Sequence, residues 1–90
     1  MAKSKSKLDE ERLIAERIDP EWDRYGGPAD ARTREGVPVW ALVSHLRLTD
    51  GDAAATAAAY GLPRASVEAA RAYYRRNAAL IDARILLNTA

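Results

Sequence analysis

Residues 51–76 read GDAAATAAAYGLPRASVEAARAYYRR, and this stretch decides the fold expected of the chain. Ala57 supplies a side chain no larger than a methyl group, which two helices need where they cross closely. Gly61 follows four residues later and accepts the positive φ of a sharp turn without steric cost. Val67 then returns an apolar side chain to the shared core six residues after the glycine. The spacing predicts a helix-turn-helix, with its second helix starting near Pro63.

The second helix of such a unit most often lies in the major groove of DNA. The candidate DNA-contacting residues are Arg64, Ala65, Ser66, Glu68, Arg71 and Arg75. Other interpretations stay open: the unit could form only a compact three-helix core, and Arg64 could be a solvated helix end. Glu68 would repel phosphates unless it accepts a hydrogen bond from a cytosine amine. Arg76 is interpreted as a solvated charge.

The charge of the chain is small but unevenly distributed. Its net charge of +1 argues against a protein that coats DNA, because phosphate neutralisation supplies most nonspecific affinity. Residues 1–35 carry eight basic and nine acidic side chains, whereas residues 62–76 carry four arginines and one glutamate, a net +3. We therefore expect the positive field to gather on the helix that would face DNA.

Size and composition indicate one small domain. A chain of 90 residues with 48% hydrophobic content buries a modest core, so a homodimer is expected. No apolar run approaches the roughly 20 residues of a membrane span, and the basic start is followed by charge rather than an apolar signal core. The sequence thus predicts a cytoplasmic protein without a membrane partner.

The composition also excludes several chemistries. The chain has no cysteine and one histidine, His45, so it lacks a disulfide framework, a thiolate zinc site and a histidine pair for a metal. It shows no nucleophile–base pair and no phosphate-binding glycine loop. We expect no catalytic residues, no metal, no cofactor and no enzymatic activity, and we interpret His45 as a surface or half-buried side chain.

The chain divides into three parts. They are a disordered tail (1–7), an N-terminal arm with an irregular segment (8–36) and a helix-turn-helix domain (37–90). In the arm, residues 10–18 have helical spacing, and the following residues up to position 36 mix glycine, proline and charge.

In the domain, Pro38 begins a helix to about Arg47, and Asp52 caps the alanine-rich helix that ends at Tyr60. The apolar stripe that begins after Pro63 continues past Asn77, so the last helix is either long or kinked there. The expected fold is all-α: a homeodomain-like helix-turn-helix core with an N-terminal helix or arm and a long C-terminal helix.

A second group of residues suggests contact with a protein partner. The candidates are Trp22, Arg32, Arg34, Leu80 and Leu87. The two leucines broaden the apolar stripe beyond what one small core uses. Arg32 and Arg34 could instead pair with Asp30 and Glu35, and Trp22 could cover the core. Tyr73 and Tyr74 are interpreted as core and dimer-seam residues rather than base-stacking platforms.

Two segments carry a resemblance to a known family. Residues 35–48, EGVPVWALVSHLRL, and 60–85, YGLPRASVEAARAYYRRNAALIDARI, resemble a bacterial family of homeodomain-like domains of unknown function that includes VapB-type antitoxins. That family has an arginine loop running into an apolar helix, here residues 30–39, and closes on an alanine–tyrosine pair, here Ala72-Tyr73. The GGP sequence at 26–28 matches the family's upstream turn only loosely.

The resemblance implies an antitoxin-like component of a toxin-antitoxin system. Such a protein would be a homodimer that binds and neutralises a PIN-like ribonuclease toxin, and double-stranded operator DNA would be a further ligand of its helix-turn-helix. The alternative is a protein-interaction module or dimeric scaffold in which the helix-turn-helix is only a core.

Overall fold

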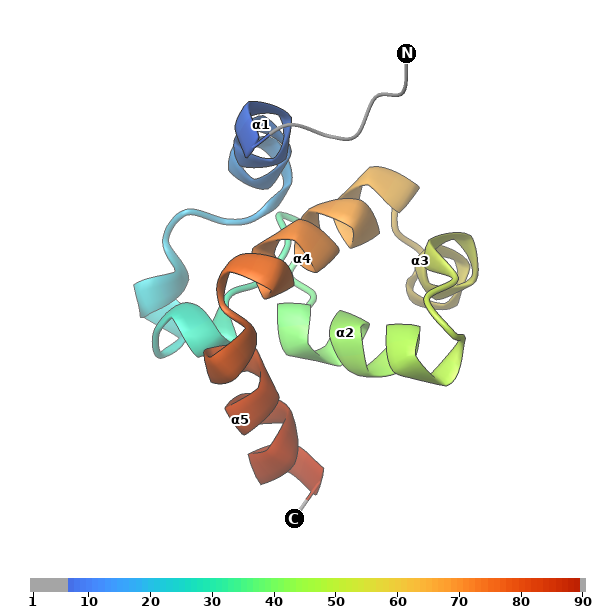
Figure 1. Ribbon diagram of the computed structural model, residues 1–90. Coiled ribbons are helices and arrows are strands. Elements are labelled where there is room, and N and C mark those ends of the chain that lie inside the picture. Colours follow the sequence, from blue (N-terminus) through green and yellow to red (C-terminus); the bar gives the residue numbers. More distant parts are fainter. Residues whose placement is uncertain (1–6, 90) are drawn as a thin grey trace.

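The computed structural model describes residues 7–89, which form an all-helical fold (Figure 1). The elements are α1 (Lys7–Arg17), η1 (Trp22–Tyr25), η2 (Pro28–Asp30), α2 (Val39–Leu48), α3 (Ala53–Tyr60), α4 (Arg64–Arg76) and α5 (Ala78–Thr89), of which η1 and η2 are short 3-10 helices. The tail predicted for residues 1–7 lies outside the described residues, except for Lys7, which begins α1. Within the described part, no helix has the length and apolar character needed to cross a bilayer.

Helix α4 lies at the centre and contacts each of the other four α-helices (Figure 1). Three of its alanines, Ala69, Ala70 and Ala72, are almost fully buried, so its neighbours approach its backbone closely. Arg76 continues the face of Ala69 and Ala72 at helical spacing, and it bonds to α1. Helix α1 therefore crosses α4 on this small-residue face.

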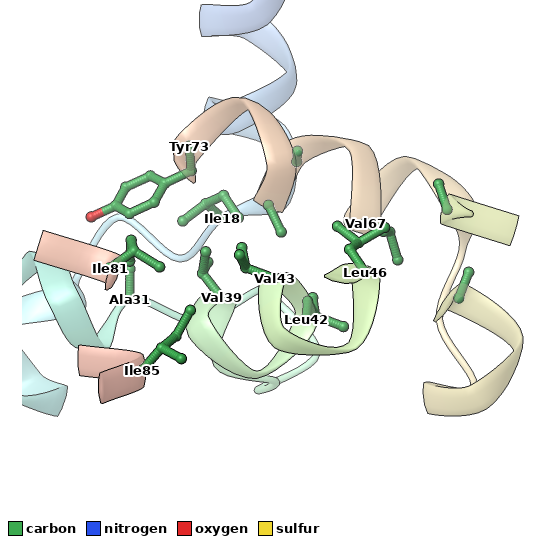
Figure 2. Packing of buried hydrophobic residues seen from close by; sticks show 14 residues of the cluster. Ile18, Ala31, Val39, Leu42, Val43, Leu46, Val67, Tyr73, Ile81 and Ile85 are labelled. Atoms are coloured by element: carbon green, nitrogen blue, oxygen red, sulfur yellow. The ribbon is translucent and has the colours of Figure 1, made fainter. Parts of the chain in front are cut away.

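The hydrophobic core lies between α2, α4 and α5 (Figure 2). Leu42 and Val39 of α2, Val67 of α4 and Ile81 of α5 are each 0% exposed. These side chains come from three separate helices, of which α2 is distant in sequence from α4 and α5, so the core forms only when the helices assemble.

The turn between α3 and α4 has the predicted local geometry. Gly61 ends α3 with φ of 67°, in the left-handed region. The backbone N–H of Leu62 donates to the carbonyl of Ala57 over 2.9 Å, a closing bond typical of glycine-terminated helices. Ala57 and Val67 both lie in the core, and Asp52 caps α3 by accepting from the backbone N–H of Ala55 at 3.0 Å.

The expected long C-terminal helix does not form, because the helix is interrupted at Asn77, where the sequence also allowed a kink. The Asn77 side-chain amide donates to the carbonyl of Tyr73 over 3.1 Å, taking the acceptor that a continuing helix would use. Its backbone N–H bonds to Tyr74 instead. The break turns α5 so that Ile81 and Ile85 reach the core.

The segment between α1 and α2 is irregular but tightly tied to its surroundings. It contains η1 and η2 and two isolated antiparallel bridges, Ile18 with Thr33 and Arg32 with Pro38. The hydroxyl of Tyr73 donates to the carbonyl of Pro28 over 2.7 Å, anchoring η2 to α4. Burial raises the pKa of this Tyr73 hydroxyl, which therefore stays a hydrogen-bond donor.

Candidate interaction surfaces

The solvent-facing stripe of α4 consists of Arg64, Glu68, Arg71 and Arg75, four of the predicted DNA-contacting residues. Glu68 lies between two arginines: its carboxylate is 3.4 Å from Arg64 Nε and 3.8 Å from Arg71 Nε. Arg71 also donates to the carbonyl of Gly51. The arginines on this stripe are therefore partly neutralised by groups of the protein itself.

Ser66 does not belong to this stripe, and its assignment as a DNA contact is wrong. It is 0% exposed, and its hydroxyl donates to the Glu35 carboxylate at 3.0 and 3.1 Å. Ala65 beside it is only half-buried. The helical period places Ser66 on the inner face of α4, next to Val67 and Ala70, so its hydroxyl cannot reach a base or phosphate.

Acidic residues of α1 neutralise the other end of α4. Glu10 forms an ion pair with Arg75 and lies 3.5 Å from Arg76, while Glu11 lies 3.6 Å from Arg76. Arg76 also donates to the backbone carbonyl of Lys7. Its interpretation as a merely solvated charge is therefore wrong, and the positive field expected over residues 62–76 is diminished by α1.

We expect the contact between α1 and α4 to depend on pH through Glu10. The hydrogen bond from Arg75 holds the pKa of Glu10 below its ordinary value. A carboxyl with a lowered pKa stabilises the folded state above its ordinary pKa, and this contribution is lost as the pH falls through the lowered value. The difference in free energy of unfolding between the wild type and Glu10→Gln, measured by urea denaturation, should shrink on acidification. A difference that is constant with pH would contradict this.

Arg32 and Arg34 do not form the pairs considered for them. Asp30 instead accepts from Arg84 at 2.8 Å, and Glu35 accepts from a serine. Arg34 donates to the carbonyl of Ala15 near the end of α1 over 2.9 Å. The Arg32 guanidinium lies 4.8 Å from the centroid of the Tyr25 ring. Both arginines therefore brace the irregular segment, and Arg34 remains exposed to solvent.

Trp22 and His45 are partly buried, and the His45 ring contacts the exposed Tyr60. Trp22 packs against the core and is partly buried, in keeping with the alternative that it covers the core. The His45 ring makes an edge contact with the Tyr60 ring, with centroids 5.5 Å apart, and is half-buried as expected.

Among residues 7–89, no three His, Cys, Asp or Glu side chains are grouped as a metal site requires.

Helix α5 carries three of the six large hydrophobic side chains that are exposed among the described residues. Leu80 is 45% exposed and Leu87 is 74% exposed, on the side of the helix away from buried Ile81 and Ile85. Together with other exposed residues of the same side they form the α5 face, which comprises Ala79, Leu80, Ala83, Leu86 and Leu87. Leu86 was missed by the sequence analysis, although it lies seven residues from Ala79 and so on the same side of the helix.

Arg84 fixes the orientation of α5. Its guanidinium stacks on the Trp40 ring, 4.6 Å from the centroid, and its Nε donates to Asp30 over 2.8 Å. These contacts join α5 to both α2 and η2. The α5 face is therefore displayed by a helix that is held at its middle.

No protein-family model, curated protein or solved structure matches this chain.

Proposed function

We propose that this chain is a small protein-binding domain and that α5 carries its main contact surface. The observation that supports this is the exposure of Leu80 and Leu87 on one side of a helix anchored by its other side. Apolar residues at helical spacing are how amphipathic helices fill a groove on a partner, and an exposed apolar stripe of this kind is uncommon on a monomer.

The partner we propose is a PIN-like ribonuclease toxin, which makes the chain antitoxin-like. This assignment comes from the sequence resemblance over residues 35–48 and 60–85, and the α5 face supplies the surface that such binding requires. Self-association through the same face is the competing possibility. The toxin complex and the homodimer can be told apart by measuring each of them separately.

Operator DNA is the second candidate ligand, favoured by Arg64, whose side chain is 66% exposed at the start of α4. A major-groove contact needs several neighbouring side chains to reach the bases. Ser66 is buried, Glu68 adds negative charge, and α1 covers the far end of the helix. Protein binding is therefore the function that the geometry supports better.

We expect the double variant Leu80→Glu, Leu87→Glu to lose the toxin complex. Glutamate keeps helix propensity while placing charge in an apolar contact, which should weaken binding about a hundredfold. The chain would be co-expressed with the product of the adjacent reading frame, and the complex would be measured by affinity capture and light scattering. Leu48→Glu, at a leucine that is 82% exposed on α2, is the matched control.

Two results would contradict the proposal. One is an unchanged toxin complex in the double variant. The other is loss of a homodimer alone, which would assign the α5 face to self-association.

An anisotropy titration with promoter DNA at two salt concentrations tests the second ligand, because phosphate contacts make affinity fall steeply with salt. Loss of promoter binding in the Arg64→Ala variant would support DNA recognition by α4.

A further inference from the structure

A groove of about 500 Å³ lies between α2, the turn after it and α4. Its lining residues are Val43, Leu46, Arg47, Asp50, Gly51, Arg71 and Tyr74. None of them belongs to the α5 face, so the groove is a separate surface. The groove combines an apolar floor with charges of both signs.

Two guanidinium groups line the groove and retain unused hydrogen-bond donors. Arg47 is held through its Nη2 atom, which donates to Asp82 over 2.6 Å and to the Tyr74 hydroxyl over 3.2 Å. Arg71 is held through its Nη2, which donates to the carbonyl of Gly51 at 3.2 Å. The Nε of Arg71 is buried and makes no hydrogen bond within residues 7–89, although it lies 3.8 Å from the Glu68 carboxylate. Since an arginine has five N–H donors, both can still bind a carboxylate.

Asp50 places a negative charge at the same groove. It lies in the turn between α2 and α3 with φ of 56°, the only non-glycine residue with positive φ among those described. Asp50 forms no ion pair within residues 7–89, whereas Asp82 is engaged by Arg47 and Tyr74. A carboxylate held in a left-handed turn beside two arginines would repel a simple anion and attract an ammonium group.

The floor of the groove is apolar. Val43 and Leu46 of α2 are 4% and 6% exposed, and they line the groove between α2 and α4. Tyr74 adds an aromatic ring, with the Arg47 guanidinium 5.7 Å from its centroid. A hydrocarbon group bound here would lose contact with water at little conformational cost to the protein.

We infer that this groove binds a free α-amino acid with an apolar side chain. Its carboxylate would accept from the unused donors of Arg71 and Arg47, and its ammonium group would pair with Asp50. The side chain would lie on Val43, Leu46 and Tyr74. A zwitterion complements the lining charges of both signs. A carboxylic acid without an ammonium group would be repelled by Asp50, and an amine without a carboxylate would be repelled by the two guanidinium groups.

Amide chemical-shift titration by NMR tests this on the full chain. We expect L-phenylalanine or L-leucine to give saturable shifts centred on the lining residues. For 3-phenylpropionate, which lacks the ammonium group, and phenethylamine, which lacks the carboxylate, we expect binding at least about tenfold weaker. Equal affinity for phenylalanine and 3-phenylpropionate would overturn the role of Asp50, and the absence of saturable shifts at millimolar amino acid would overturn the site.

Two variants and a control complete the test. Asp50→Asn removes the charge but keeps a residue that tolerates positive φ, and Arg71→Gln removes the guanidinium. Each should weaken phenylalanine binding about tenfold or more, while Asp50→Asn should leave 3-phenylpropionate binding no weaker than in the wild type. Arg64→Gln, on the same helix but outside the groove, should bind as the wild type does. Equal losses in all three variants would overturn the inference.

Discussion

Replacing Leu42 by alanine is expected to lower the free energy of unfolding by about 3 kcal/mol. Leu42 is 0% exposed and is the largest of the completely buried side chains. It lies in the layer of α2 that packs into the core, so truncation removes apolar contacts and leaves a cavity. A domain of this size has a total stability of the order of 5–13 kcal/mol, so the loss would be a large part of it.

Leu48→Ala provides the matched control for this experiment. Leu48 lies on the same helix and is 82% exposed, so the same chemical change should alter stability by less than about 0.5 kcal/mol. Both variants would be compared with the wild type by urea denaturation followed by circular dichroism. Similar losses from the two substitutions would contradict the core described for α2, α4 and α5.

Replacing Ala72 by leucine is expected to cost about 2 kcal/mol and to displace α1 from α4. Ala72 is 1% exposed on the face of α4 that continues to Arg76, the residue bonded to α1. A larger side chain there cannot be placed without moving a helix. Because Glu10 would separate from Arg75, the arginines at the end of α4 would also become more accessible.

Ala58→Leu is the control for this overpacking experiment, because Ala58 is exposed on α3. Urea denaturation would give the stability of each variant, and hydrogen exchange would report the protection of the α1 amides. We expect faster exchange in α1 for Ala72→Leu alone. An Ala72→Leu variant with wild-type stability and unchanged protection of α1 would show that α1 does not pack on this face.

Much of the local structure could be predicted from the sequence. Gly61 adopts the left-handed conformation proposed for it, Asp52 caps α3, and Pro38 and Pro63 each directly precede a helix. These features depend on a residue's own φ preference or on a hydrogen bond to a neighbour a few positions away. The interruption at Asn77 is local in the same way, because its side chain bonds to the carbonyl four residues earlier.

The candidate sites were harder to predict. Ser66 and Arg64 are two residues apart, yet Ser66 is buried and bonded to Glu35, whereas Arg64 is exposed. The pairing of Glu10 with Arg75 joins positions 65 residues apart. No periodicity in either segment indicates it, because an ion pair between surface helices depends on which faces meet. The groove lined by Asp50 and Arg71 likewise depends on how α2 and α4 pack together, which no local pattern in the sequence indicates.

The sequence by itself determined that the described chain is largely helical, approximately where α2 and α3 begin and end, and that Gly61 turns one helix into the next. These follow from interactions between close neighbours along the chain. Only the tertiary structure decided that α1 covers one side of α4 and that α5 turns at Asn77 to expose Leu80 and Leu87. Burial depends on contacts between distant segments, and several helix arrangements satisfy the same local preferences.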